Sequence, residues 1–131
     1  KERFRRFVTH FAEHFPEAET ELHFSNPFEL LVAVILSAQC TDKRINQISP
    51  ALFARFPDAT SLAAASVDEV FGYIRSVSYP NNKAKHLVGM ARRLVDVYGG
   101  EVPGTLADLQ TLPGVGRKTA HVILSIVYNQ P

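Results

Sequence analysis

The sequence contains little cysteine and carries almost no net charge. Its 131 residues include one cysteine, Cys40, and 14 basic side chains against 13 acidic ones, for a net charge of +1. A single cysteine excludes an intrachain disulfide and a cysteine-rich metal or iron–sulfur site built by this chain alone, and it suits a reducing compartment. A net charge near zero excludes a polybasic arm that coats a polyanion by bulk charge. Any site for a polyanion must therefore be local.

The small positive charge is distributed unevenly along the chain. Residues 1–74 carry 7 basic and 10 acidic side chains, whereas residues 75–131 carry 7 basic and 3 acidic ones. The first part therefore has a net charge of −3 and the second part a net charge of +4. A local site for an anion is expected in the second part.

Long apolar runs and targeting signals are also missing. The apolar run at residues 28–38 is interrupted by Glu29 and is too short to cross a bilayer, and the N-terminus has no signal-peptide pattern. These features predict a cytosolic or nuclear protein with no membrane attachment, which would be cytoplasmic and associated with the nucleoid if the source is bacterial. The chain has no initiator methionine and stops at Pro131 after an apolar segment, so we expect it to be a piece of a longer protein.

Apolar residues recur at helical spacing along almost the whole chain, with no sustained strand pattern, which predicts an all-α fold. One helix is expected over residues 1–16, with Phe4, Phe7 and Phe11 on one face. Residues 17–131 are expected to form a six-helix lobe. Its central helix begins after Asn26 and is apolar on all sides, as a buried helix should be. The short connections predict a compact multi-helix bundle.

Further helices are expected where a capping side chain precedes an apolar pattern. Pro50 is expected to kink or split the helix in which it falls. The long helix that contains Leu87 and Leu94 is expected to end at the Gly99–Gly100 pair. The expected helix starts are Asp42, Ser66 with Glu69 as its capping-box partner, the Asn81–Asn82 pair and Thr105.

Two glycines and two cations surround the start of the last expected helix, residues 117–127. Gly114 and Gly116 flank one residue, so this backbone can approach a phosphate and present N–H groups to it beside the positive end of the helix. Arg117 and Lys118 add full charges that oppose the helix dipole, at a cost of a few tenths of a kcal/mol each, roughly. A tight connection between helices is the simpler interpretation, but the unfavourable cations favour a site for an anion or a reaction.

Several blocks of sequence together resemble one protein family. They are TEL at residues 20–22, SNPFELL at 25–31, LSAQCTD at 36–42, NKA at 82–84, GEVP at 100–103 and LPGVGRKTA at 112–120. In order and spacing these blocks resemble the endonuclease III family of DNA glycosylases and abasic-site lyases. The last block resembles the family's helix-hairpin-helix signature, and the resemblance covers nearly the whole chain.

The resemblance implies base-excision repair of damaged double-stranded DNA. Oxidised pyrimidines would be removed, and the abasic site would be cleaved by β-elimination. Lys118 matches the family's lysine that attacks C1′ of the damaged nucleotide and forms a Schiff base. The positive helix end and the adjacent Arg117 both favour the neutral amine that such an attack needs. A surface clamp for phosphate is the alternative role for Lys118.

The resemblance also implies contacts with DNA. Gln39 is expected to occupy the space left by the extruded base, with a helix C-terminal cap as its alternative role. Tyr79 falls where the family uses an apolar or aromatic wedge. The sequence Ser78-Tyr79-Pro80 departs from the more usual Gly-hydrophobic-Tyr, which leaves open which side chain wedges the duplex. The other expected DNA contacts are Lys83, Leu112, Gly114, Val115, Gly116 and Arg117. By default Lys83 would be an ordinary solvated charge on a helix, as Lys85, Arg92 and Arg93 are expected to be.

The family also has parts that would follow Pro131. These are a catalytic aspartate shortly after the hairpin and four cysteines that bind a 4Fe–4S cluster, so no metal site is expected in this chain. We expect the activity in the longer parent and little or none in this piece. Without the cluster lobe, the helix at residues 1–16 is expected to expose an apolar face or to self-associate.

Two other functions are compatible with the same residues. A non-catalytic helix-hairpin-helix module would bind duplex phosphates, and it would have no need of Lys118. An adenine-type mismatch glycosylase is related to this family, but that branch typically lacks a lysine at this position. A small-molecule enzyme is disfavoured, because the chain offers neither a phosphate loop nor a nucleophile–base pair.

Overall fold

The computed structural model of the protein describes residues 22–127. The helix expected over residues 1–16 and its apolar face of Phe4, Phe7 and Phe11 lie outside the described residues. The expectation that this face is uncovered or self-associates therefore stays a prediction.

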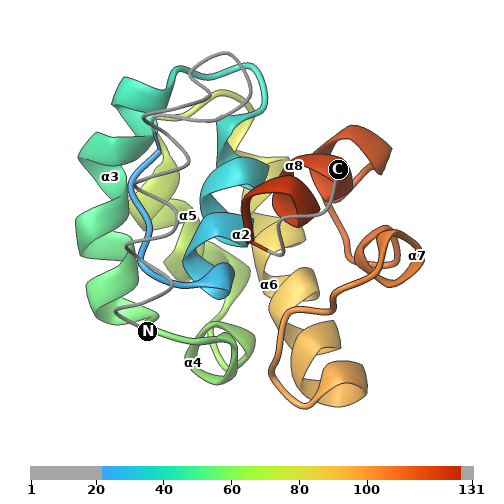
Figure 1. The fold of residues 1–131 in the computed structure, drawn as a ribbon. Helices are drawn as coiled ribbons and strands as arrows, with labels where there is room; N and C mark the ends of the chain where they lie inside the picture. The colour runs from blue at the N-terminus through green and yellow to red at the C-terminus, as the bar shows by residue number, and fades with distance from the viewer. Residues whose placement is uncertain (1–21, 128–131) are drawn as a thin grey trace.

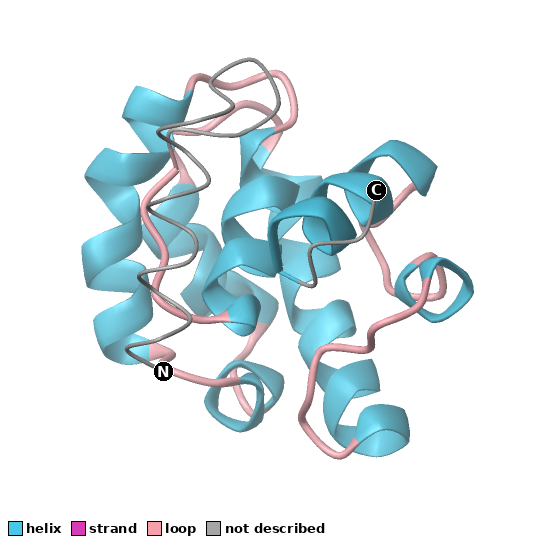
Figure 2. Cartoon of the chain, in the orientation of Figure 1, coloured by secondary structure: helices cyan, strands magenta, loops and turns pink. Residues whose placement is uncertain are grey.

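The described residues form an all-helical bundle, as the apolar spacing predicts (Figures 1 and 2). They contain seven helices, one more than expected, and no strand. None of these helices is both long and apolar enough to cross a membrane. The helices are α2 (Pro27–Ser37), α3 (Asp42–Arg55), α4 (Ala59–Ala63), α5 (Val67–Ile74), α6 (Pro80–Tyr98), α7 (Leu106–Leu109) and α8 (Arg117–Val127).

Helix α2 lies at the centre of the bundle and packs against α3, α6 and α8 (Figure 1). Asn26 caps its start, because the Asn26 side chain accepts a hydrogen bond of 2.9 Å from the N–H of Glu29. The predicted buried helix is thus confirmed. Burial of each large side chain contributes about 1.5–3 kcal/mol, so α2 supplies much of the core energy. Its buried residues are Phe28, Leu30, Leu31, Val32, Ala33, Ile35 and Leu36.

Helix α3 runs without a break through Pro50, which corrects the expectation that this proline splits it. Pro50 is exposed, so its ring projects from the surface of a helix that continues with one backbone donor fewer. The C-terminal end of α3 then joins α5 at the surface, where the Arg55 guanidinium lies 2.7 Å from the Glu69 carboxylate. The Phe56 ring meets Tyr73 edge-on with ring centres 5.7 Å apart.

Two helix starts differ from the capping pattern in the sequence. Helix α4 was not expected, although Asp58 and Ser61 form a reciprocal capping box at its start. At α5, only one of the two hydrogen bonds of the expected capping box is formed. The N–H of Glu69 donates to the Ser66 hydroxyl at 3.0 Å, while the Glu69 carboxylate pairs with Arg55.

Helix α6 is the longest described helix and packs against α2, α4 and α5. It begins at Pro80, so the expected cap at Asn81–Asn82 is wrong: both asparagines lie in its first turn. Proline suits the first helical position, because its missing N–H would have no intrahelical acceptor there. The expected end is confirmed, since Gly99 has φ +63° and the N–H of Gly100 donates to the Leu94 carbonyl at 2.7 Å.

The turn between α7 and α8 packs directly on α6. Gly114 has φ +82°, a left-handed conformation that favours glycine, and a Cβ added there would lie 3.0 Å from Cβ of His86. One residue earlier, the Pro113 ring lies 3.2 Å from where a Cβ of Gly89 would be. The absence of side chains at both glycines allows this close approach between the turn and α6.

Gly114→Ala should destabilise the chain. The left-handed backbone alone should cost about 1–2 kcal/mol, and the contact with His86 adds to this cost. Urea unfolding measures the loss. Gly72→Ala is the matched control: Gly72 is in α5 with open space around its Cβ position, so this change should stabilise the chain by about 0.5–1 kcal/mol. Equal effects of the two substitutions would contradict the described turn.

Candidate functional site

The turn from Gln110 to Gly116 connects α7 to α8 at the right of Figure 1. The Thr105 hydroxyl caps α7 by accepting from the N–H of Asp108 at 3.2 Å, as its position in the sequence predicts. Helix α8 covers Arg117–Val127, the range expected from the sequence. Helix, turn and helix therefore form a hairpin.

Two side chains of the hairpin point into the core. Leu112 is 2% exposed and Val115 is 6% exposed, and both belong to the hydrophobic core. The N–H of Val115 donates to the Leu112 carbonyl at 3.1 Å. Because these side chains are buried, a contact of Leu112 or Val115 with DNA would have to come from the backbone, and the contacts expected of both residues stay predictions. Both residues stabilise the turn from inside, and the outer surface of the turn is formed by the residues that follow them.

The outer surface of the turn consists of backbone and two cations. Gly116, Arg117 and Lys118 are all exposed. Within residues 22–127 the N–H groups of Gly116 and Arg117 have no hydrogen-bond acceptor, as expected at the start of a helix. A Cβ added at Gly116 would meet no atom within 4 Å, so packing among the described residues does not require glycine there. This combination of bare amides, helix end and two positive charges suits a phosphate.

Side chains from α6 fix the direction of the hairpin. The Thr111 hydroxyl donates to the Asp108 carbonyl at 2.6 Å and receives a hydrogen bond of 3.0 Å from Nε of Arg93. The hydroxyl of Tyr98 lies 3.0 Å from the same oxygen. Three segments meet at Thr111, so the hairpin is held against the C-terminal half of α6.

A second group of candidate residues lies where α2 ends and where α6 begins. Gln39 follows α2 with φ +58°, and Tyr79 precedes α6 with φ +52°. Both side chains are exposed, Tyr79 to 63%. The Ser78 hydroxyl donates to the Gln39 carbonyl at 2.6 Å, so the two loops, at the top of Figure 1, lie side by side. The C-cap of α2 is Ala38 and not Gln39, and the Gln39 side chain is exposed; the role of Gln39 in DNA stays a prediction.

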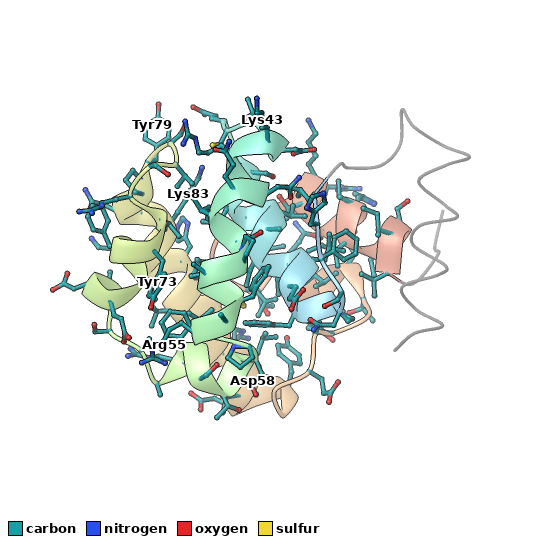
Figure 3. The ribbon with its side chains drawn as sticks, turned by 90° about the vertical axis from the view of Figure 1, so that its left-hand side faces the viewer. Lys43, Arg55, Asp58, Tyr73, Tyr79 and Lys83 are labelled. Atoms are coloured by element: carbon teal, nitrogen blue, oxygen red, sulfur yellow. The ribbon has the colours of Figure 1, made fainter. Side chains whose placement is uncertain are left out.

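Lys83 is not the solvated surface charge that the sequence suggested. It is 5% exposed, and its Nζ donates to the carbonyls of Leu36 at 2.7 Å and Ala38 at 2.5 Å. Burial lowers the pKa of Lys83 from its ordinary value, and the nearby Cys40, when ionised, opposes this shift. Lys83 therefore binds the end of α2 and not the solvent (Figure 3).

Helical spacing alone would have revealed the burial of Lys83. Lys83, Leu87, Met90 and Leu94 recur every three or four residues along α6, and all four are buried. A lysine in register with an apolar stripe faces the core, whatever its charge suggests. Lys85 and His86, which fall between the positions of this stripe, are exposed.

The chain's own residues do not fit an iron–sulfur cluster. Cys40 is its single cysteine, whereas such clusters are generally held by four cysteine thiolates. Over residues 22–127, no group of three or more histidine, cysteine or acidic side chains is placed to hold a metal ion.

Comparison with known proteins gives close relatives. The chain is 49% identical over 111 residues to endonuclease III of Synechocystis sp., 44% over 117 residues to that of Bacillus subtilis, and 40% over 124 residues to that of Escherichia coli K12. The alignments cover 85%, 89% and 95% of this chain but 51%, 53% and 59% of these relatives. The chain thus spans little more than half the length of the curated relatives it matches.

Solved structures agree with the sequence relatives. A trapped endonuclease III–DNA covalent intermediate matches the chain with a TM-score of 0.84 at 41% identity, over 99% of this chain and 61% of that one. A non-covalent endonuclease III–DNA complex matches equally well. A thermostable thymine-DNA glycosylase, at 21% identity and a TM-score of 0.79, shares the fold.

A sequence model of a protein family also matches most of the chain. The model described as HhH-GPD superfamily base excision DNA repair protein matches residues 32–127, a range that includes the Gln39 and Tyr79 loops and the hairpin before α8. The chain belongs to the HhH-GPD superfamily of base excision DNA repair proteins.

Proposed function

We propose that this chain is the hairpin-bearing part of a DNA glycosylase and abasic-site lyase that removes oxidised pyrimidines from double-stranded DNA. The observation that carries the proposal is the position of Lys118, an exposed lysine in the first turn of α8, next to amides that have no protein acceptor within the described residues. A phosphate bound at those amides would bring the sugar–phosphate backbone to the lysine. The similarity to endonuclease III–DNA structures supports the same arrangement.

The proposed reaction uses the amine of Lys118 as a nucleophile. The neutral amine attacks C1′ of the damaged nucleotide, the bond from C1′ to the base breaks, and the base leaves with the electron pair and takes up a proton. Loss of the amine proton and ring opening give a Schiff base between Nζ and C1′. Removal of a proton from C2′ then expels the 3′ phosphate, and water releases Lys118.

The exposed loop residues have a complementary role in this proposal. A base that leaves the stack opens a gap, and a side chain that fills the gap offsets the cost of unstacking. Gln39 and Tyr79 project from neighbouring loops, so they are suited to enter the duplex together. The partner of the chain is therefore damaged double-stranded DNA, in the cytoplasm and with the nucleoid if the source is bacterial.

Two further components of the proposed enzyme are not among the residues of this chain. One is an aspartate that assists the lysine, and the other is a 4Fe–4S cluster held by four cysteines. The chain spans little more than half the length of the curated relatives it matches and contains one cysteine, so the proposal assigns both components to the complete protein. Full activity is accordingly expected of that protein and little or none of the 131-residue chain alone.

A non-catalytic DNA-binding module is the second candidate function. The bare amides and Arg117 would suffice to bind a phosphate without any reaction. Such a module would make no covalent intermediate, so trapping of the Schiff base separates the two candidates.

Lys118→Ala should abolish covalent trapping. Borohydride reduces a Schiff base to a stable amine, so the complete protein that contains this chain should form an adduct with a duplex carrying an abasic site, seen as a band of reduced mobility. The variant loses the only proposed nucleophile and should lose the band. The matched control is Lys85→Ala, an exposed lysine on α6, which should keep it. An adduct that survives Lys118→Ala would refute the nucleophile, and no adduct in the unmodified protein would favour the binding module.

Gly116→Ala should weaken DNA binding without weakening the fold. A methyl group there meets no protein atom, so the free energy of unfolding should change by less than about 0.5 kcal/mol. It would project toward the bound phosphate and raise the Kd by about tenfold, roughly 1.4 kcal/mol. Fluorescence anisotropy of a labelled duplex at constant salt measures the Kd. Unchanged affinity would show that phosphate does not approach this backbone.

A further inference from the structure

The junction between the end of α2 and the start of α6 is held by three hydrogen bonds from two side chains. Lys83 supplies two of them, to the carbonyls of Leu36 and Ala38, and Ser78 supplies the third, to the carbonyl of Gln39. These contacts join residues 39 to 47 positions apart in the chain. The junction is thus a tertiary connection between two loops and not a local turn.

Lys83 supplies two of the hydrogen bonds at the end of α2. The last carbonyls of a helix have no intrahelical donor and need partners from elsewhere. The Val34 carbonyl accepts from the Ser37 hydroxyl at 2.8 Å, and the Ser37 carbonyl accepts from the N–H of Cys40 at 3.0 Å. The carbonyls of Leu36 and Ala38 receive their hydrogen bonds from Nζ of Lys83. A single amino group therefore fixes the path of the backbone immediately before Gln39.

The conformations of the two loops need such support. Gln39 and Tyr79 have φ values of +58° and +52°, in the left-handed region that residues other than glycine rarely adopt. A residue in this region keeps its conformation only where surrounding contacts impose it. At the Gln39 loop those contacts come from Lys83 and Ser78.

The position of Lys83 links both loops to one side chain. Lys83 lies in the first turn of α6, where its N–H donates to the Tyr79 carbonyl at 3.1 Å, while its Nζ reaches the end of α2. In Figure 3, Tyr79 is at the upper edge of the molecule and Lys83 is below it, toward the interior. The backbone of Lys83 thus contacts one loop and its side chain contacts the other.

We propose that Lys83 is a positioning residue that holds the Gln39 and Tyr79 loops in the relative arrangement needed to enter a DNA stack together. Lys83 is buried and does not touch DNA, so it acts through the two residues that do. The inference rests on the proposed function, because it assigns to Gln39 and Tyr79 the task of filling the gap that an extruded nucleotide leaves. It replaces the direct DNA contact expected of Lys83 from the sequence.

The test compares two duplexes that differ only in whether a stack must be opened. In the first, an abasic site lies in a fully paired duplex. In the second, the abasic site lies in a bubble of unpaired nucleotides between paired flanks, where there is no stack to fill. Both present the same sugar to Lys118, and borohydride trapping by the complete protein measures both rates.

Lys83→Met keeps the length and apolar stem of the side chain but removes the donors. The trapping rate on the paired duplex should fall by about tenfold or more, because small misplacements of positioning groups produce losses of this order. The rate on the bubble should change by less than about twofold, since Lys118 and the hairpin are unaffected. Lys85→Met, the matched control on an exposed position of the same helix, should leave both rates unchanged.

The outcomes separate the inference from the function on which it rests. If the unmodified protein traps neither duplex, the proposed function fails. If it traps both, and Lys83→Met lowers both rates equally or lowers neither, the lyase stands and the positioning role of Lys83 is overturned. Equal loss would mark Lys83 as a residue needed for folding alone.

A second variant keeps the test decisive if Lys83→Met does not fold, as judged by its thermal unfolding. Ser78→Ala removes the surface hydroxyl that holds the Gln39 carbonyl and leaves the buried core intact. It should lower the rate on the paired duplex by about threefold, because fewer contacts are lost than in Lys83→Met. The rate on the bubble should stay unchanged. Equal rates of Ser78→Ala and the unmodified protein on the paired duplex would overturn the proposal.

Discussion

The structure depends on the burial of a whole helix. Helix α2 is surrounded on its sides by α3, α6 and α8, and it contributes seven side chains to the apolar core. Its side surfaces need no polar partner, but its two ends carry backbone groups that must find one. At the start, Asn26 meets this need, and the Glu29 carboxylate accepts from both the N–H and the hydroxyl of Ser25. At the end, Ser37 and Cys40 supply local partners, and Lys83 supplies those of the Leu36 and Ala38 carbonyls.

The two candidate regions of the site use helix ends in opposite ways. At the end of α2, the side chains of Lys83 and Ser78 bond the carbonyls of Leu36, Ala38 and Gln39, which makes the Gln39 and Tyr79 loops well defined. The start of α8 keeps amides without acceptors in the described part of the chain, which makes it available to an anion. One region is built for fixed geometry and the other for binding. Both rest on the same property of helices, the unpaired groups in their terminal turns.

The sequence predicts much of the fold because most of its signals are local. The all-α class, the buried α2, the cap at Asn26, the short helix after Thr105 and the span of α8 follow from periodicity and capping residues. Helix α4 was missed, because its five residues give too little periodicity and its box uses Ser61 in place of the usual Glu or Gln. Pro80 was a better signal for the start of α6 than the two asparagines that follow it.

The candidate site was predictable as a set of residues but not as a geometry. The turn with Gly114 and Gly116 stands out in the sequence, and so does Lys118. The inward direction of Leu112 and Val115 and the two carbonyls that the Lys83 amino group meets depend on packing between elements far apart in the chain, which local patterns do not contain. Lys83 shows the difference most clearly. Its charge suggested solvent, whereas its register with Leu87 placed it in the core.

Helix α6 connects the two halves of this site. Lys83 near its start holds the loops around Gln39 and Tyr79, and Arg93 near its end holds the hairpin through Thr111. Ten residues of helix separate the two anchors, a span of about 15 Å at 1.5 Å per residue. The rise of DNA is 3.4 Å per nucleotide along one strand, so this span is about that of four nucleotides. The backbone of a single helix therefore sets the distance between the two regions, with the rigidity of its own hydrogen bonds.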